Sequence, residues 1–241
     1  VKHGMAERKG FAAELLDALQ KNFAGAADLR EYLKKQPKYG NDLDEPDSVA
    51  VRIARMTSAK VHALRNPAGN PFLPDFSTPS THLLYGYHVG ATPDGRAARE
   101  MLGYGIDPRP ENAMGGRIDM LLSERKLDYS DFLGGYAAHL GISPQVFRNG
   151  KNTDEKMVIF TEKIIKPLFG YKEELDNTPF YVYFNIDSKV NLRKVLENPK
   201  KYAPGGIYIM RIHGTFVNFL DLSPAIQNDI IARLDADERA S

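Results

Sequence analysis

The sequence has 241 residues, of which 42% are hydrophobic, enough for one large domain or two small ones with a sizeable core. Lysine and arginine together number 32 against 31 aspartates and glutamates, and the charges are interspersed, so nothing indicates a nucleic-acid partner. No apolar run approaches the ~20 residues that cross a bilayer, and the residues from Val1 onward lack the hydrophobic stretch of a secretory signal. We therefore expect a cytoplasmic protein without membrane contact.

The sequence contains no cysteine. This excludes disulfides, thiolate metal sites and a thiol nucleophile within these 241 residues. Six histidines are present, but no two of them have the spacing of a local zinc motif, and we expect no protein-bound metal.

The first part of the chain shows the periodicity of amphipathic helices. Apolar residues at helical spacing predict helices over residues 8–22, 27–35 and 45–65. Proline and glycine within residues 66–71 end the third helix. Residues 37–42 are rich in turn-forming residues and are predicted to form a loop.

The middle of the chain is less regular. Residues 81–89 are aromatic and bounded by proline and glycine clusters, which predicts a short buried strand. Residues 97–127 contain many glycines and prolines and predict a long loop with a short strand at 118–122. Helices are predicted over residues 129–140 and 153–168.

The last part of the chain alternates between the periodicity of a strand and that of a helix. Strands are predicted over residues 180–186 and 206–212, and helices over residues 189–198 and 224–234. Helices that alternate with short buried strands indicate α/β architecture.

Gly214 follows the predicted strand 206–212 on the loop before the last helix, within the segment 210–217 (MRIHGTFV). The α-carbon of glycine can hold an unpaired electron because it lies between an electron-donating amide nitrogen and an electron-withdrawing carbonyl. Without a side chain, this centre can also become planar, and the backbone can fold tightly around it. An ordinary strand-to-loop glycine with positive φ is the more common explanation of this pattern, so Gly214 alone does not decide the function.

Four other segments occur in a fixed order around this glycine. They are residues 29–42, residues 92–96 (TPDGR), residues 184–202 with Phe184-Asn185-Ile186 and Asn198-Pro199, and residues 227–233 (QNDIIAR). Taken alone, residues 92–96 predict a type I turn with Arg96 as a surface cation. Together with the Gly214 segment, the five resemble the glycyl radical enzymes, the superfamily of pyruvate formate-lyase.

The resemblance implies a fold that this chain only partly supplies. Members of the family have a ten-stranded α/β barrel of two five-stranded halves with surrounding helices, and this chain aligns with its C-terminal part. The implied division is a helical segment of the barrel surround (1–70), barrel strands with the TPDGR loop and helices (71–205), and a glycyl radical domain of strand, glycine loop and closing helix (206–241). Half a barrel exposes strand edges and an apolar face, so we expect a partner chain to complete it.

The resemblance also implies a chemistry. Gly214 would be the catalytic residue that stores the radical, and Arg211, His213, Thr215 and Phe216 would be its neighbours in the radical loop. No cofactor would be bound permanently, because a separate activase that uses S-adenosylmethionine and an iron–sulfur cluster installs the radical. The radical would then pass to a cysteine on a larger subunit or N-terminal fragment and cleave a C–C or C–X bond in a small organic substrate. Such a lyase would be an anaerobic, oxygen-sensitive hetero-oligomer.

Two residues beside Gly214 depart from the family pattern and leave the function of the chain open. His213 stands where the family usually has serine, alanine or cysteine, and Thr215 stands where it usually has an aromatic residue. Both departures favour an alternative, a non-catalytic structural or radical-repair subunit of a glycyl radical enzyme. Asp94 and Arg96 are candidates to bind a substrate or to order the glycine loop through charge-assisted hydrogen bonds, and Asn185 is a third candidate for these roles.

Overall fold

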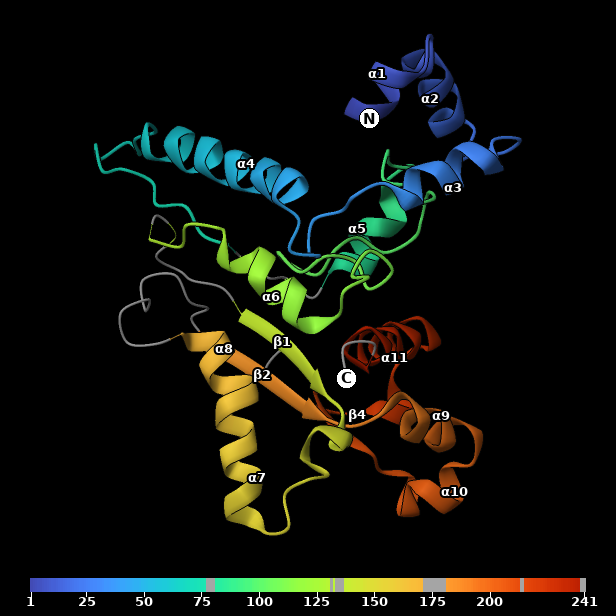
Figure 1. The fold of residues 1–241 in the computed structure, drawn as a ribbon, viewed down its shortest axis with the longest axis vertical. Helices are drawn as coiled ribbons and strands as arrows, with labels where there is room; N and C mark the ends of the chain where they lie inside the picture. Colours follow the sequence, from blue (N-terminus) through green and yellow to red (C-terminus); the bar gives the residue numbers. More distant parts are fainter. Residues whose placement is uncertain (77–80, 131, 133–136, 171–180, 213–214, 239–241) are drawn as a thin grey trace.

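The computed structural model describes residues 1–76, 81–130, 132, 137–170, 181–212 and 215–238. A helical N-terminal part is followed by a short parallel sheet with its crossover helices and then by a hairpin that packs against the last helices (Figure 1). The elements in chain order are α1 (Lys2–Glu7), α2 (Phe11–Gln20), α3 (Ala27–Lys35), α4 (Asp44–His62), α5 (His82–His88), α6 (Arg117–Arg125), β1 (Ala137–Ile142), α7 (Thr153–Phe160), α8 (Lys166–Phe169), β2 (Tyr181–Ile186), α9 (Lys189–Glu197), α10 (Pro199–Tyr202), β3 (Ile209–Ile212), β4 (Thr215–Asn218) and α11 (Pro224–Glu238).

The strands in the described ranges form two sheets of two strands each. β1 and β2 are parallel, with the register running from Ala137↔Tyr181 to Ile142↔Ile186. The connection between them contains α7, a π-helical turn over Thr161–Ile165 and α8, as parallel pairing requires a long crossover. β3 and β4 form an antiparallel hairpin, and β3 lies beside β2. The parallel unit with its helical crossover confirms the expected α/β class.

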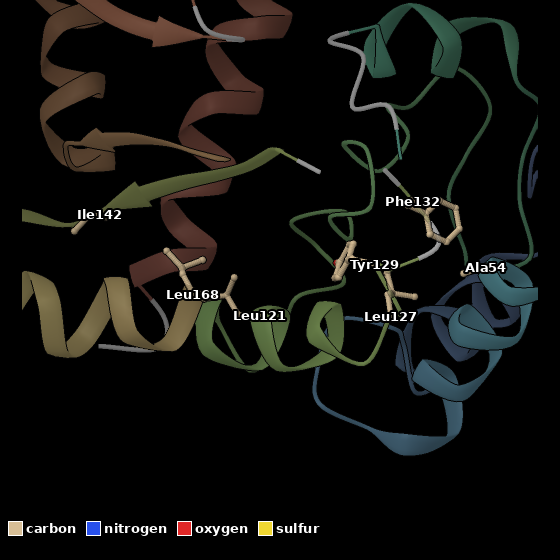
Figure 2. Close-up of a cluster of buried hydrophobic side chains, with 7 residues drawn as sticks. All are labelled: Ala54, Leu121, Leu127, Tyr129, Phe132, Ile142 and Leu168. Atoms are coloured by element: carbon tan, nitrogen blue, oxygen red, sulfur yellow. The ribbon is translucent and has the colours of Figure 1, made fainter. Parts of the chain in front are cut away.

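Three clusters of buried apolar side chains hold these elements together. One joins α2 to α3. The second joins α4, α6, β1 and α8, and Figure 2 shows its members: Ala54, Leu121, Leu127, Tyr129, Phe132, Ile142 and Leu168. The third packs α9, β3 and α11 around Leu192, Val195, Met210, Phe219, Ile231 and Leu234. This third cluster fixes the hairpin against the last helix.

Most elements with clear periodicity are confirmed. The predicted helices near residues 8–22, 27–35, 45–65, 189–198 and 224–234 correspond to α2, α3, α4, α9 and α11, and the strand at 180–186 corresponds to β2. The region 153–168 is helical, with the π-helical turn inside it. The short helices α1 and α10 were not predicted, because neither is long enough to show a period.

The predicted strand at 81–89 is wrong, because these residues form α5. His82 and Gly86, four residues apart, are its buried positions, whereas Leu84 and Tyr87 are exposed. A short apolar run does not distinguish a strand from a helix. Here Gly86 decides, because it lets the helix approach the backbone of Glu100 so closely that an added Cβ would lie 2.4 Å from the carbonyl oxygen.

Three further predictions need correction. The predicted strand at 118–122 lies within α6, whose buried residues Met120, Leu121, Ser123 and Glu124 follow the helical period. The predicted helix at 129–140 is wrong over 137–140, which belong to β1; residues 131 and 133–136 lie outside the described residues. Pairing with a strand more than 40 residues away overrides local preference there. The strand predicted from residue 206 begins at Ile209, after a 3₁₀ turn over Pro204–Gly206.

Candidate functional site

The β3–β4 hairpin carries the segment that was predicted to be reactive. Ile212 pairs with Thr215, and Met210 pairs with Val217, so these four residues share one face of the hairpin. His213 and Gly214 connect the two strands in the sequence and lie outside the described residues. The Ile212–Thr215 pair therefore fixes both ends of the two-residue connection that contains Gly214.

A cavity of about 250 Å³ lies between this face of the hairpin and the last helix. Four separate segments meet around it: α5 with His82, β1 with Gly141, β2 with Asn185 and α11 with Ile226 and Ile230. The walls from β3, β4 and α11 are largely aliphatic. At about 30 Å³ per water molecule in the liquid, the cavity has room for several waters or one very small organic molecule.

One wall of the cavity holds a buried charged cluster on α5 and α11. Nε2 of His82 lies 3.1 Å from Oδ2 of Asp229, and both side chains are buried. Nη2 of Arg233 donates to the same carboxylate oxygen and lies 3.3 Å from Nε2 of His82. The guanidinium carbon of Arg233 stands 4.2 Å from the ring centre of Tyr104, which also contacts the His82 ring edge-on. The cluster fixes α11 to α5.

The electrostatics of the cluster favour an ionised Asp229. Burial alone would raise the pKa of Asp229, but the hydrogen bond with His82 and the charge of Arg233 outweigh it and hold the pKa below its usual value. Burial raises the pKa of Tyr104, so its hydroxyl stays protonated at neutral pH. The cluster therefore contains a carboxylate and a guanidinium in direct contact.

The closing-helix motif at 227–233 owes its residue types to these contacts. The amide of Gln227 donates to the carbonyl of Phe219 at 3.0 Å, while Asp229 and Arg233 bind His82. The sequence analysis did not select His82 or Tyr104. His82 is 147 residues from Asp229, so no local spacing relates the two.

The structure brings three of the predicted site residues together. The side-chain amide of Asn185 donates to the carbonyl of Arg211 at 2.7 Å, and its Oδ1 accepts from the N–H of Arg211 at 3.1 Å. The guanidinium of Arg211 stands 4.9 Å from the ring centre of Tyr183 and 5.6 Å from that of Phe216. Thr215 Oγ1 donates to the carbonyl of Ile212 at 2.9 Å.

Asp94 and Arg96 lie in a different environment. The turn at 92–95 forms as predicted, with the N–H of Gly95 bonded to the carbonyl of Thr92, but Arg96 is not a surface cation: it is only 1% exposed. Within the described part of the chain, its guanidinium donates to Thr92 and to the carbonyls of residues 89, 90, 97 and 100. Asp94 accepts from Thr92 Oγ1 at 2.5 Å. These side chains order their own loop.

Two kinds of feature are absent from the part of the chain that the structure describes. There, no group of three or more histidine, cysteine, aspartate or glutamate side chains is arranged to hold a metal ion. None of the helices there is long and apolar enough to span a bilayer.

Comparisons with known proteins agree with the resemblance. The model of the pyruvate formate lyase-like family matches residues 2–86. The isethionate sulfite-lyase of Nitratidesulfovibrio vulgaris is 30% identical over 240 residues, which cover 96% of this chain and 26% of that protein.

Solved structures agree with the sequence matches. A glycyl radical enzyme from Archaeoglobus fulgidus superimposes with a TM-score of 0.74 at 27% identity, over 92% of this chain and 27% of that one. The glycerol-bound B12-independent glycerol dehydratase of Clostridium butyricum gives a TM-score of 0.73 at 30% identity, over 92% and 26% of the two chains. The chain spans about a quarter of the length of these relatives. The chain is similar to the glycyl radical enzymes, as its sequence motifs indicated.

Proposed function

We propose that this chain is the radical-bearing part of a glycyl radical enzyme and that Gly214 stores the radical. One observation carries the proposal. In a chain that resembles this family, the Ile212–Thr215 pair fixes both ends of the segment that contains Gly214, beside a largely apolar cavity lined by α11. A carbon radical persists only where solvent and oxygen are kept away. The cavity is partly open and Thr215 and Phe216 are exposed, so the partner polypeptide would have to complete the enclosure.

The thiol that works with this glycine must come from outside these 241 residues, which contain no cysteine. The relatives are about four times as long as this chain, so a second subunit or another part of a longer polypeptide would supply it. An activase that uses S-adenosylmethionine and an iron–sulfur cluster would remove one hydrogen atom from the Gly214 α-carbon. The glycyl radical would then take a hydrogen atom from the thiol. The thiyl radical that remains would react with the substrate.

The relatives' names indicate which type of bond would be cleaved. One is a sulfite-lyase and another is a dehydratase, and both names describe elimination at a carbon–heteroatom bond. We therefore propose C–X bond cleavage in a small organic substrate, in an oxygen-sensitive complex of the anaerobic cytoplasm. The protein's contribution would be to hold and shield the reactive atoms while the radical supplies the chemistry.

Electron paramagnetic resonance tests this proposal directly. The chain would be isolated anaerobically with its partner polypeptides after exposure to the activase. We expect a doublet that collapses to a singlet when the cells are grown with α-deuterated glycine. Gly214→Ala should abolish the signal, whereas Gly90→Ala, where an added Cβ meets nothing within 4 Å, should retain it. A full doublet in Gly214→Ala would disprove the assignment of the radical to this residue.

The unusual residues His213 and Thr215 support a second candidate, a structural or radical-repair subunit. Co-purification distinguishes the catalytic role from the structural or repair role. A fixed 1:1 complex with a cysteine-bearing polypeptide favours the catalytic role. Reversible association with an otherwise complete glycyl radical enzyme favours the repair role.

A further inference from the structure

The hairpin is attached to the β1–β2 sheet through a side chain rather than through a continuous strand ladder. In an antiparallel pair, the N–H and C=O of every second residue point away from the partner strand. Arg211 is such a residue of β3, because both of its backbone groups bond to Asn185 on β2 instead of to β4. The amide of Asn185 has the same donor and acceptor as a peptide group, so it takes the place of a third strand.

A second contact from β2 reaches the same residue. Tyr183 lies two positions before Asn185, on the same face of the strand, and its ring is 4.9 Å from the guanidinium carbon of Arg211. The guanidinium carbon also lies 5.6 Å from the centre of the Phe216 ring, from the strand position opposite Arg211. Backbone and side chain of Arg211 are thus both held by β2, one residue before the Ile212–Thr215 pair.

We infer that Asn185 is the positioning residue of the radical hairpin: its two hydrogen bonds to the Arg211 backbone fix the β3–β4 hairpin on β2 and thereby set the place of the Ile212–Thr215 pair. This inference rests on the proposed function, because the position of Gly214 matters only if it carries the radical. The docking itself can be measured without any radical. Asn185 would act through Arg211 and would not touch the reacting atoms.

The chain offers a matched control in Asn218. Its Oδ1 accepts from the N–H of Tyr208 at 2.8 Å and its Nδ2 donates to the carbonyl of Gly206 at 3.0 Å, so it also makes two backbone hydrogen bonds. Both asparagines are half-buried. The bonds of Asn218 lie at the base of the hairpin and do not reach β2, so Asn218→Leu removes as many bonds as Asn185→Leu without undocking the hairpin from the sheet.

The first measurement is amide hydrogen exchange in the intact complex. Losing two hydrogen bonds should increase the undocked population by a factor of about 5 to 30, and the exchange rate of the Arg211 amide should rise by the same factor in Asn185→Leu. Asn218→Leu should accelerate exchange at Tyr208 and leave Arg211 unchanged. Asn185→Gln keeps the amide on a longer side chain and should restore part of the protection.

The second measurement is the glycyl doublet of the same variants. We expect Asn185→Leu to lower the spin yield and to shorten the anaerobic lifetime of the signal several-fold, with partial recovery in Asn185→Gln and wild-type behaviour in Asn218→Leu. Unchanged Arg211 exchange in Asn185→Leu would overturn the inference, as would equal losses of signal in the two leucine variants. A wild-type complex without a doublet would instead overturn the proposed function, and the exchange data would still decide whether Asn185 docks the hairpin.

Discussion

His82 on α5 and Asp229 on α11 are 147 residues apart in the sequence, yet Nε2 of one and Oδ2 of the other lie 3.1 Å apart with both side chains buried. Arg233 completes the contact from the next turn of α11. Because α11 also lines the cavity beside the hairpin, this cluster connects the stability of the last helix with the shape of the cavity.

Removing the Asp229 carboxylate should destabilise the folded protein. Asp229→Ala leaves a partly buried guanidinium and a buried imidazole without their shared acceptor, and we expect the free energy of unfolding to fall by about 3 kcal/mol. Urea denaturation followed by circular dichroism measures the loss. The control is Asp221→Ala, an exposed position just before α11, which should change stability by less than about 0.5 kcal/mol. Equal effects of the two substitutions would show that the cluster contributes nothing.

The same carboxylate predicts how stability depends on pH. The pKa of Asp229 is lower in the folded protein than in the unfolded chain, where it is about 3.9. Its contribution is therefore complete above the unfolded pKa and is lost as the pH falls through the folded pKa. The difference in unfolding free energy between the wild type and Asp229→Asn should shrink as the pH falls below about 4. A difference that grows on acidification would contradict the lowered pKa.

Gly86→Ala tests the close approach that makes α5 possible. Alanine favours a helix by about 1 kcal/mol over glycine. The added Cβ would, however, lie 2.4 Å from the Glu100 carbonyl oxygen and 2.8 Å from the Met101 α-carbon, and both are backbone atoms. Overpacking of this kind costs about 1–3 kcal/mol, so we expect a net destabilisation in thermal unfolding. Gly90→Ala is the control, since its Cβ meets no atom within 4 Å; a stabilised Gly86→Ala variant would refute the close contact.

Arg96→Lys tests whether the arginine of the TPDGR loop is structural. A lysine ammonium cannot reproduce the planar set of donors that serves Thr92 and four carbonyl groups, and several buried acceptors lose their partner. We expect a loss of at least about 2 kcal/mol in chemical denaturation. Arg99→Lys, at an exposed position of the same loop, should remain within about 0.5 kcal/mol of the wild type. If Arg96→Lys had the same denaturation midpoint as the wild type, the arginine would have a role other than stabilising the fold.

The sequence by itself determined the features that depend on short-range patterns. The 3.6-residue period located α2, α3, α4, α9 and α11, because each of these helices buries one side over several turns. Five motifs in a fixed order were enough to indicate the family. The absence of cysteine also determined, without any coordinates, that the proposed thiol must come from outside these residues.

Tertiary structure alone decided the rest, because those features depend on contacts between distant segments. Residues 82–88 are a helix rather than a strand since Gly86 meets the backbone of Glu100. Residues 137–142 are a strand because they pair with β2, and Arg96 is buried because its own loop folds around its guanidinium. Asn185 became a docking side chain only when the fold placed it against Arg211, 26 residues later in the chain. Hydrogen-bond partners at such separations leave no periodic signal, so only the folded structure reveals them.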